Sequence, residues 1–406
     1  MKKVLIWDLN INLLNTGGPA GYLYNIHEYL KCNNELGKPI FFLKDILNRK
    51  NVDGRFKSQH SLANRVLSIL DCLSLIGFYR FYRAYKKWFR TETSGQVCNL
   101  DLSQYDAIHF HRSTDLCAAI KLLKGYKGKI LLTSHSPQPL CYEILDFVPF
   151  GKGIVRFFFL NKMLALELRA WNRADYLVFP VEGAIEPYFV EPQMKQYLQT
   201  HLDKVKYCPS AILDEKECSK KGLREKLNIP EDAFLVAYIG RHTAVKGYDQ
   251  LKQIANTVLS ERSDIYFVVA GNQHPIKELN NPKWIELGWI NYGNEVIANS
   301  DLFVLPNKET YFDLVALEVM RQGTPILMTS TGGNKYFSKF GEDNGFFFYT
   351  YGDINEAKEK LFDIISLKQK NELTSKACNI RKTFERNFTI DSFVERYCKL
   401  LEAITL

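Results

Sequence analysis

Two cationic side chains, five residues apart, follow an apolar run that ends in glycine. They are Arg241 and Lys246, in residues 240–247. An arginine can bind a phosphate through two donors, whereas a lysine acts as a compact point charge. A diphosphate leaving group needs such a pair, because negative charge builds on it as the bond to it breaks. The alternative is a pair of solvated surface cations, and two residues by themselves do not decide between these interpretations.

A second polar group lies between residues 301 and 333, where a short apolar run leads into a polar loop and then a helical pattern. Backbone N–H groups at the start of that helix, near Asp313, Leu314 and Val315, could bind a phosphate. Glu318 follows about one turn later, where a carboxylate can accept hydrogen bonds from both hydroxyls of a ribose. The alternative is a helix whose acidic first turn only complements the helix dipole.

The histidines form a third group. His109 and His111 flank Phe110 at the end of one apolar run, and His135 closes a later one. Imidazoles bind zinc well, but no carboxylate or cysteine is suitably spaced nearby, so we predict no metal site. For His111, lining of a binding site and plain packing both remain open. His242 lies between the two cations of the first group and is expected to point to water.

The elements that must position these residues begin with alternating β-rich and helical stretches in the first half of the chain. Strands are predicted at residues 4–9, 39–43, 106–110, 129–134, 176–179 and 205–207. Gly17, Gly18 and Pro19 predict a tight turn into a helix that runs to about Lys31, because glycine permits the turn and proline suits a first helical turn. Strands that alternate with helices indicate parallel βαβ units.

The same alternation restarts in the second half, after a boundary near residues 211–215. Strands are predicted at residues 234–239, 265–270, 284–287, 302–305 and 325–328, with helices at 314–322 and 392–402. We therefore predict an α/β fold of two Rossmann-like, doubly wound domains that face each other across a cleft. Ligands of such sheets bind at the carboxyl ends of the strands, which is where most of the polar residues above fall.

The order and spacing of these segments resemble the retaining glycosyltransferases of family 4 (glycosyl transferases group 1), which have the GT-B fold. In the first half the resemblance rests more loosely on residues 17–21 and 133–135. In the second half it rests on Gly240-Arg241, Lys246-Gly247, Ala270-Gly271, Leu287-Gly288, residues 300–306 and 314–320, Gly323-Thr324-Pro325 and Gly332-Gly333.

The resemblance implies a nucleotide-sugar site. Arg241 and Lys246 would hold the donor diphosphate, Glu318 would hold the ribose, and His135 would lie beside the reacting sugar; these four would form the catalytic set. The remaining donor contacts would come from Gly17, Gly18, Trp289, Ile290, Glu309, Thr310, Asp313, Leu314 and Val315.

The chain departs from the family pattern at two positions before the helix. The family has two glutamates with seven residues between them, and counting back from Glu318 reaches Thr310, with Glu309 one residue away. Either residue would fill this position, although a threonine hydroxyl carries no charge. Asp313 stands where the family usually has glycine. Its side chain would narrow the sugar pocket, which predicts an unusual donor sugar.

The composition is that of a globular protein with a modest basic excess. Lys and Arg number 53 against 45 Asp and Glu, and the formal net charge is +8. There is no basic tail, helix-turn-helix signal or zinc-finger spacing, so no nucleic-acid partner is predicted. Nine scattered cysteines without a CxxC motif predict a reduced cytoplasmic protein.

Two basic and apolar stretches, residues 61–90 and 152–173, have two interpretations. They lie on an anionic membrane surface, or they are core-facing helices with a solvated basic face. No apolar run reaches transmembrane length. The predicted location is therefore cytoplasmic, with peripheral attachment to the inner face of the membrane as the further possibility.

The resemblance implies a metal-independent, retaining hexosyltransferase. A UDP- or GDP-linked sugar would be the co-substrate, with no cofactor, and the acceptor would be a glycan or lipid-linked glycan in cell-surface polysaccharide biosynthesis. No Asp-x-Asp sequence occurs, the motif with which glycosyltransferases of the other major fold bind a divalent metal. Residues 1–212 would bind the acceptor, 213–388 the donor, and 389–406 would return to the first domain. The alternatives are a sugar-nucleotide epimerase on the same fold and a non-catalytic sugar-nucleotide-binding partner subunit.

Overall fold

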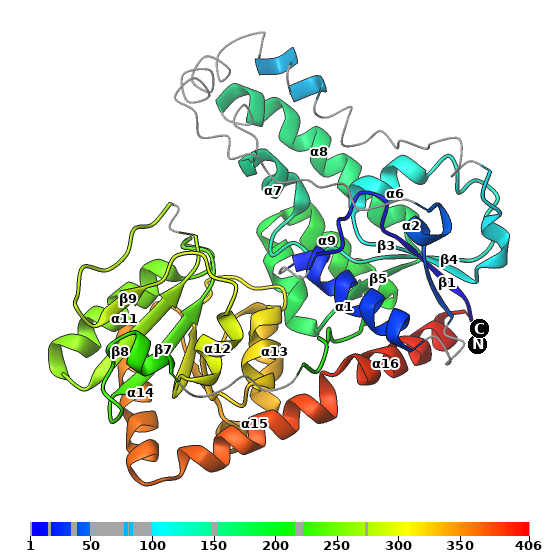
Figure 1. The fold of residues 1–406 in the computed structure, drawn as a ribbon. Coiled ribbons are helices and arrows are strands. Elements are labelled where there is room, and N and C mark those ends of the chain that lie inside the picture. The colour runs from blue at the N-terminus through cyan, green and yellow to red at the C-terminus, as the bar shows by residue number, and fades with distance from the viewer. Residues whose placement is uncertain are drawn as a thin grey trace. The chain divides into compact units, whose positions relative to one another are not determined.

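The computed structural model describes residues 2–14, 18–33, 39–48, 77–79, 81–83, 99–147, 153–215, 222–272 and 275–405. The chain divides into two compact units (Figure 1). Unit 1 contains residues 1–179, 186–208 and 394–406, and unit 2 contains residues 180–185 and 209–393. Each unit is therefore built from separated stretches of sequence.

Unit 1 is organised around a six-stranded sheet in the order β2-β1-β3-β4-β5-β6. All neighbouring strands are parallel. β1 and β3 are buried along their whole length, as expected for parallel strands with helices on both faces. The strands are β1 (Val4–Trp7), β2 (Ile40–Phe42), β3 (Ala107–Phe110), β4 (Lys129–Leu132), β5 (Tyr176–Phe179) and β6 (Val205–Tyr207).

The helices of unit 1 connect these strands in crossovers. They are α1 (Gly18–Cys32), α2 (Leu43–Ile46), α6 (Ser113–Ala119), α7 (Leu140–Phe147), α8 (Gly153–Arg173) and α9 (Pro192–Thr200), with the 3-10 segments η2 (Leu102–Gln104) and η4 (Leu202–Lys204). Gly18 begins α1 with a φ of 76°, a conformation that glycine adopts without strain.

Unit 2 repeats the architecture with a parallel sheet in the order β12-β11-β10-β7-β8-β9. Its core includes the sheet face against α11 and α14, and α11 turns Leu251, Ile254 and Val258 toward that core at helical spacing. The strands are β7 (Phe234–Ile239), β8 (Ile265–Ala270), β9 (Trp284–Glu286), β10 (Leu302–Leu305), β11 (Ile326–Thr329) and β12 (Phe346–Tyr349).

Two further segments are shared between the units: η3 (Glu182–Val190) and the last helix, α16 (Ile390–Ile404). The remaining helical segments belong to unit 2. They are α10 (Leu223–Lys226), α11 (Tyr248–Glu261), α12 (Gly293–Ala298), α13 (Leu314–Arg321), η5 (Gly332–Lys339), η6 (Glu342–Asn344), α14 (Ile354–Gln369) and α15 (Leu373–Asn387).

The strand order of unit 2 decides where a ligand can bind. From β7 the chain moves outward to β8 and β9, then returns to the other side of β7 to form β10, β11 and β12. The order therefore reverses between β7 and β10. Ligands of open parallel sheets bind at such a switch point, beyond the carboxyl ends of the strands.

The predicted α/β fold of parallel sheets is confirmed. Strands β5, β6, β7, β8 and β10 begin and end at the predicted residues, and the other predicted strands differ by one or two residues at an end. β12, α14 and α15 were not predicted. The stretch 61–90 lies mostly outside the described residues, as do Gly17 and Lys152.

Candidate functional site

The cationic loop of unit 2 leaves the carboxyl end of β7, at the switch point. It carries Arg241 and Lys246 and ends at Gly247, whose φ is 66°. A Cβ built on Gly247 would lie 1.7 Å from the carbonyl oxygen of Pro306, the residue that follows β10. The Lys308 N–H also donates to the Val245 carbonyl at 3.0 Å. Close backbone packing therefore joins the loop after β7 to the loop after β10.

This packing brings two of the predicted site residues together. The Lys246 ammonium lies 2.6 Å from Asp313 Oδ1 and 2.8 Å from Oδ2. Asp313 is the residue that precedes α13, and its Oδ2 also accepts a hydrogen bond from the Asn307 side-chain amide. Asn307 is fully buried and was not predicted as a site residue. Its place directly after Pro306 at the end of β10 is the only sequence signal that could have marked it.

Arg241 is exposed, and its guanidinium makes no hydrogen bond or ion pair with the part of the chain that the structure describes. Its backbone is fixed, because the Tyr238 hydroxyl donates to the Arg241 carbonyl at 3.0 Å. Burial raises the pKa of Tyr238; the Asp313 carboxylate raises it further, and the Arg241 guanidinium opposes the rise. Both charged groups therefore act on the same hydroxyl.

The two candidates for the first glutamate position differ sharply in exposure. Thr310 is fully buried, and its Oγ1 has no hydrogen-bond partner among the described residues. The Thr310 carbonyl accepts from the Gly333 N–H at 3.1 Å, and a Cβ on Gly332 would lie 2.3 Å from it. Glu309 is half-buried, and its charge contributes to a raised pKa of Tyr351. Which of the two meets a sugar stays a prediction.

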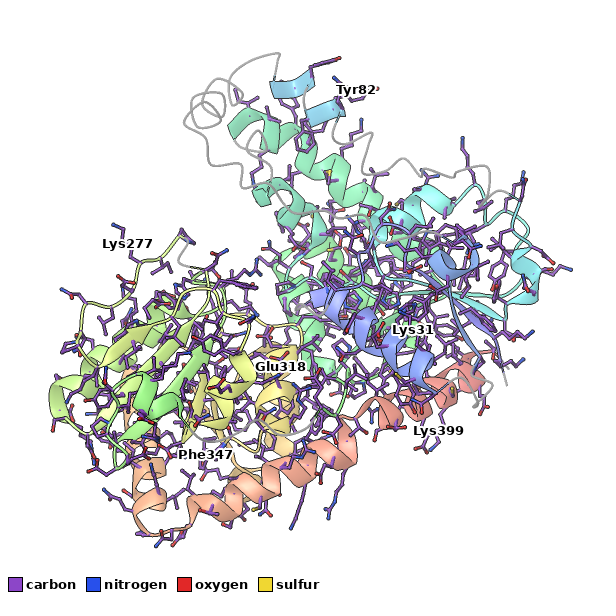
Figure 2. All side chains as sticks on the ribbon, viewed as in Figure 1. Lys31, Tyr82, Lys277, Glu318, Phe347 and Lys399 are labelled. Carbon is purple, nitrogen blue, oxygen red and sulfur yellow. The ribbon has the colours of Figure 1, made fainter. Side chains whose placement is uncertain are left out.

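Glu318 lies on α13, where Figure 2 labels it, and is half-buried, as are Leu314 and Val315 at the start of the helix. Burial raises the pKa of the Glu318 carboxyl, Arg321 opposes this and Glu215 adds to it. The positive charge of Arg321 thus offsets only part of the rise in the pKa of Glu318.

The loop after β9 carries the two residues predicted to meet a base. Gly288 has a φ of 66°, and its carbonyl accepts from the Gly271 N–H at 2.8 Å. Trp289 is 76% exposed, and Ile290 is half-buried. The exposed indole follows a backbone turn that is anchored to the end of β8.

The expectation that His242 points to water is wrong. Its side chain is fully buried and stacks on Tyr248, with ring centroids 3.8 Å apart and an interplanar angle of 9°. Its Nε2 lies 3.5 Å from Glu286 Oε1. Burial lowers the pKa of His242 to about 4, so the ring is neutral near pH 7. Its position in a glycine-bounded loop gave no signal that the ring turns inward.

The histidines of unit 1 gather at the carboxyl ends of β3 and β4: His109 lies in β3, His111 directly follows it, and the half-buried His135 follows β4. The His109 and His111 ring centroids are 4.2 Å apart, and those of His111 and His135 are 5.2 Å apart. His111 Nδ1 and His135 Nε2 share a hydrogen bond of 2.9 Å. Burial lowers the pKa of His109 and of His135 to about 3, and that of His111 also falls well below its usual value. All three rings are therefore neutral near pH 7.

His109 has a partner that sequence reasoning missed. The Thr133 hydroxyl donates to the Val178 carbonyl at 2.9 Å, so it must accept from His109 Nε2, 2.8 Å away. His109 Nδ1 is then the acceptor for the Tyr397 hydroxyl at 2.6 Å. Tyr397 lies on α16, 288 residues away in sequence, and nothing in the local pattern predicted the contact.

Unit 2 has a further hollow, and the described residues form no metal site. Among the described residues no group of three or more His, Cys, Asp or Glu side chains could hold a metal ion. A cavity of about 540 Å³ lies at the opposite, amino edge of the unit 2 sheet, next to Asp301 and Pro325. The Asp301 carboxylate there already pairs with Arg224 at 3.0 Å and Lys368 at 2.8 Å. The Asp301 charge in this cavity is therefore already compensated by two cations of the chain.

Comparison with known families identifies unit 2. Residues 219–379 match the family model described as "Glycosyl transferases group 1". These residues form a glycosyl transferases group 1 domain. The domain contains the cationic loop, Asp313 and Glu318, so the switch-point residues lie within the part of the chain that the model matches.

Two curated relatives differ in how much of them the chain covers. A glycogen synthase of Clostridium botulinum is 29% identical over 160 residues, which are 34% of this chain and 32% of the relative. The O-antigen biosynthesis glycosyltransferase WclY of Escherichia coli is 24% identical over 307 residues, 73% of this chain and 78% of the relative. The chain thus spans about a third of the length of the glycogen synthase that it matches.

Solved structures of the same fold span the whole chain. Sucrose-phosphate synthase from Thermosynechococcus elongatus has a TM-score of 0.61 at 15% identity and covers 100% of this chain and 99% of its own. Anabaena Alr3699/HepE, in complex with UDP-glucose, has a TM-score of 0.61 at 16% identity, and the match covers 99% of this chain and 100% of that chain. The group 1 domain and its companion unit therefore have the GT-B fold.

Proposed function

We propose that this chain is a glycosyltransferase that moves a sugar from a nucleotide sugar to a hydroxyl of a glycan. The observation that carries the proposal is the arrangement at the β7–β10 switch point. There Arg241 and Lys246 share the loop after β7, and Lys246 contacts Asp313 at the start of α13, all within a group 1 domain. Cations and helix N–H groups at this position suit a diphosphate whose negative charge grows in the transition state.

The proposed roles are those that the family resemblance implies for these residues. Arg241 and Lys246 bind the donor diphosphate, and the half-buried Glu318 carboxylate accepts hydrogen bonds from the ribose hydroxyls. The backbone at Trp289 and Ile290 meets the base, which is uracil or guanine. His135 is neutral, so it stabilises the reacting sugar through hydrogen bonding rather than charge. Unit 2 is the proposed donor unit and unit 1 the proposed acceptor unit.

Retention of anomeric configuration without a metal is the finer part of the proposal. The described cationic loop, residues 240–247, contains no carboxylate that could act as a nucleophile, and the Asp313 carboxylate beside it is paired with Lys246. Attack of the acceptor on the same face, with the departing phosphate taking the acceptor proton, needs only the cations and helix N–H groups. The proposed acceptor is a lipid-linked glycan of cell-surface polysaccharide biosynthesis.

The test is a binding and transfer screen with UDP- and GDP-linked sugars. Thermal-shift measurements first find which nucleotide sugar stabilises the wild-type protein. We expect Lys246→Ala and Arg241→Ala each to lose that stabilisation and to lower transfer at least about a hundredfold. Arg262→Ala is the matched control: Arg262 pairs with Asp264 before β8, at the amino edge of the sheet, and should leave both readouts unchanged.

The alternatives give different results in the same screen. A partner subunit that only binds the nucleotide sugar would be stabilised by it but would transfer no sugar to any acceptor. An epimerase would convert the donor without an acceptor. No stabilisation by any UDP- or GDP-sugar would contradict the proposal as a whole.

A further inference from the structure

The lysine proposed to bind the diphosphate is already paired with an anion inside the protein. Both Asp313 oxygens lie within 2.8 Å of the Lys246 Nζ, so the ammonium meets the carboxylate as a bidentate pair. The side chains are 20% and 16% exposed, so water screens the pair only partly. This carboxylate therefore occupies part of the ammonium's hydrogen-bonding shell.

Asp313 is held in this position from a second element. The Asn307 amide donates to Asp313 Oδ2 from the end of β10. The Asn307 carbonyl in turn accepts from the hydroxyls of Thr329, at 2.6 Å, and Thr331, at 3.1 Å, at the end of β11. Residues at the ends of β7, β10 and β11, which are neighbours in the sheet, thus hold the Asp313 carboxylate against Lys246. The pair is a built feature rather than a chance contact between flexible surface side chains.

The pairing reduces the charge that the site offers to a phosphate. Arg241 and Lys246 supply two positive charges, and Asp313 removes one. A diphosphate that approaches Lys246 must compete with the carboxylate for the same N–H donors and must accept a like charge beside it. A nucleotide sugar can recover this cost, because a carboxylate released from Lys246 can accept hydrogen bonds from sugar hydroxyls. A nucleoside diphosphate without a sugar cannot.

We propose that Asp313 is an internal counter-ion that the donor diphosphate must displace from Lys246, and that it makes the site select donors with an uncharged sugar over free nucleoside diphosphates. The inference rests on the proposed function. Asp313 is thus a specificity-determining residue. It weakens the binding of the spent diphosphate and disfavours a sugar that carries its own carboxylate.

The test is Asp313→Asn, which keeps the side-chain volume and a good residue before the helix but removes the charge. We expect the variant to bind UDP or GDP, whichever the wild type binds, with a dissociation constant about tenfold lower, measured by isothermal titration calorimetry. Affinity for the corresponding nucleotide sugar should improve much less, since the carboxylate's contacts with the sugar are lost. The ratio of the two affinities is therefore the diagnostic readout.

Two further variants control the experiment. Asp343→Asn removes one negative charge from an exposed position in unit 2 and should leave both affinities within about twofold, because solvent and salt screen a distant charge. Asp313→Gly should tighten nucleoside diphosphate binding as Asp313→Asn does, which separates the lost charge from any new amide contact. Melting temperatures of all variants verify that they fold.

The outcomes separate this inference from the proposed function. If the wild type binds UDP or GDP and neither Asp313 variant binds it more tightly, Asp313 supports the lysine rather than competing with the phosphate, and the counter-ion inference is overturned alone. If the wild type binds no UDP, GDP or nucleotide sugar, the proposed function fails and the inference falls with it.

Discussion

At the scale of single residues, glycine has its strongest effect where two loops touch. Gly247 combines a left-handed backbone with a carbonyl oxygen so close that no side chain fits. Lys246 is its neighbour, so the position of the proposed phosphate-binding ammonium depends on this contact. The glycine thus acts on the site through packing, without a functional group of its own.

Replacing Gly247 by alanine should lower the free energy of unfolding by more than backbone strain alone would. Gly247→Ala must adopt a positive φ and also push against Pro306. Gly288 has the same φ of 66° but nothing within 4 Å of its Cβ position, so Gly288→Ala isolates the strain, about 1 kcal/mol. We expect Gly247→Ala to lower the free energy of unfolding by at least about 2 kcal/mol more, measured by urea denaturation. Equal losses in the two variants would show that the Pro306 contact relaxes freely.

The same scale marks the limit of what sequence predicts. The switch-point residues could be singled out one by one, because glycines, cations and a helix start are local signals. Their partners could not. Asp313 reaches Lys246 across 67 residues and Tyr397 reaches His109 across 288, and only the folded strand order and the path of α16 create those contacts.

At the scale of elements, buried strands were predicted well and their surroundings less so. Five strands match to the residue. Four of them, β5, β7, β8 and β10, read as short uninterrupted apolar runs, as expected of parallel strands covered on both faces. The fifth, β6, is a short edge strand that contains Lys206. β12 has the same character, with the sequence Phe-Phe-Phe-Tyr, and could have been found. The inward turn of His242 could not, because it depends on the Tyr248 ring and the Glu286 carboxylate lying beside it.

The start of α7 depends on a carboxylate from another helix. Glu167 on α8 is buried and accepts the backbone N–H groups of Leu140 and Cys141, each at 3.0 Å. The Tyr188 hydroxyl donates to the Ser136 carbonyl at 3.0 Å, in the loop between His135 and α7. Burial raises the pKa of Glu167 to about 7 despite these bonds. The anchoring of this loop is thus coupled to a titration near neutral pH.

This titration predicts how stability depends on pH. The folded state holds a proton on Glu167 that the unfolded state releases above its ordinary value of 4.5. The contribution of Glu167 to stability is therefore complete below about pH 4.5 and is lost as pH rises to about 7, a loss of about 3 kcal/mol. Glu167→Gln does not titrate, so its free energy of unfolding should lack this fall.

The measurement is the difference in free energy of unfolding between wild type and Glu167→Gln from pH 5 to pH 8. Taking the difference removes the contributions that other groups with shifted pKa values make to the pH dependence in both proteins. Examples are Asp8, whose pKa burial raises to about 6, and His109 and His135, whose pKa values burial lowers to about 3. Parallel curves for the two proteins would mean that Glu167 keeps an ordinary pKa in the fold.

At the scale of the whole molecule, one end of α8 presents apolar side chains to solvent. Phe157 is 73% exposed and Phe158 60%, and Arg156 lies between them and Ile154, which is 48% exposed. Nearby, the Lys162 ammonium lies 5.9 Å from the centroid of the Tyr82 ring, a residue labelled in Figure 2. No helix in the described part of the chain is both long and apolar enough to span a membrane. We propose that residues 152–173 contribute a membrane-contacting surface in a cytoplasmic protein; a core-facing helix with a solvated basic face is the alternative.

This surface predicts binding to anionic vesicles. Wild-type protein should sediment with liposomes that contain an anionic lipid and less with purely zwitterionic ones, since both charge and aromatic insertion contribute. The double variant Phe157→Ser, Phe158→Ser should lower the bound fraction severalfold. Leu202→Ser is the matched control, because Leu202 is 61% exposed in the same unit but lies outside the aromatic group. Equal sedimentation of all three proteins would assign the exposed phenylalanines another role.

The contact at Gly183 affects which residues a chimaera between this protein and a relative must include. Gly183 lies in residues 180–185, which belong to unit 2 although the stretches before and after them belong to unit 1. A Cβ on Gly183 would lie 2.0 Å from the Gly332 carbonyl oxygen. A chimaera joined at residues 208 and 393 would transplant the rest of unit 2 without residues 180–185, and would rely on the recipient to supply a glycine opposite Gly332. The smallest single block that carries unit 2 intact is residues 180–393, which includes residues 186–208 of unit 1. A single exchange that keeps the Gly183–Gly332 contact from one parent therefore also carries a part of unit 1 with it.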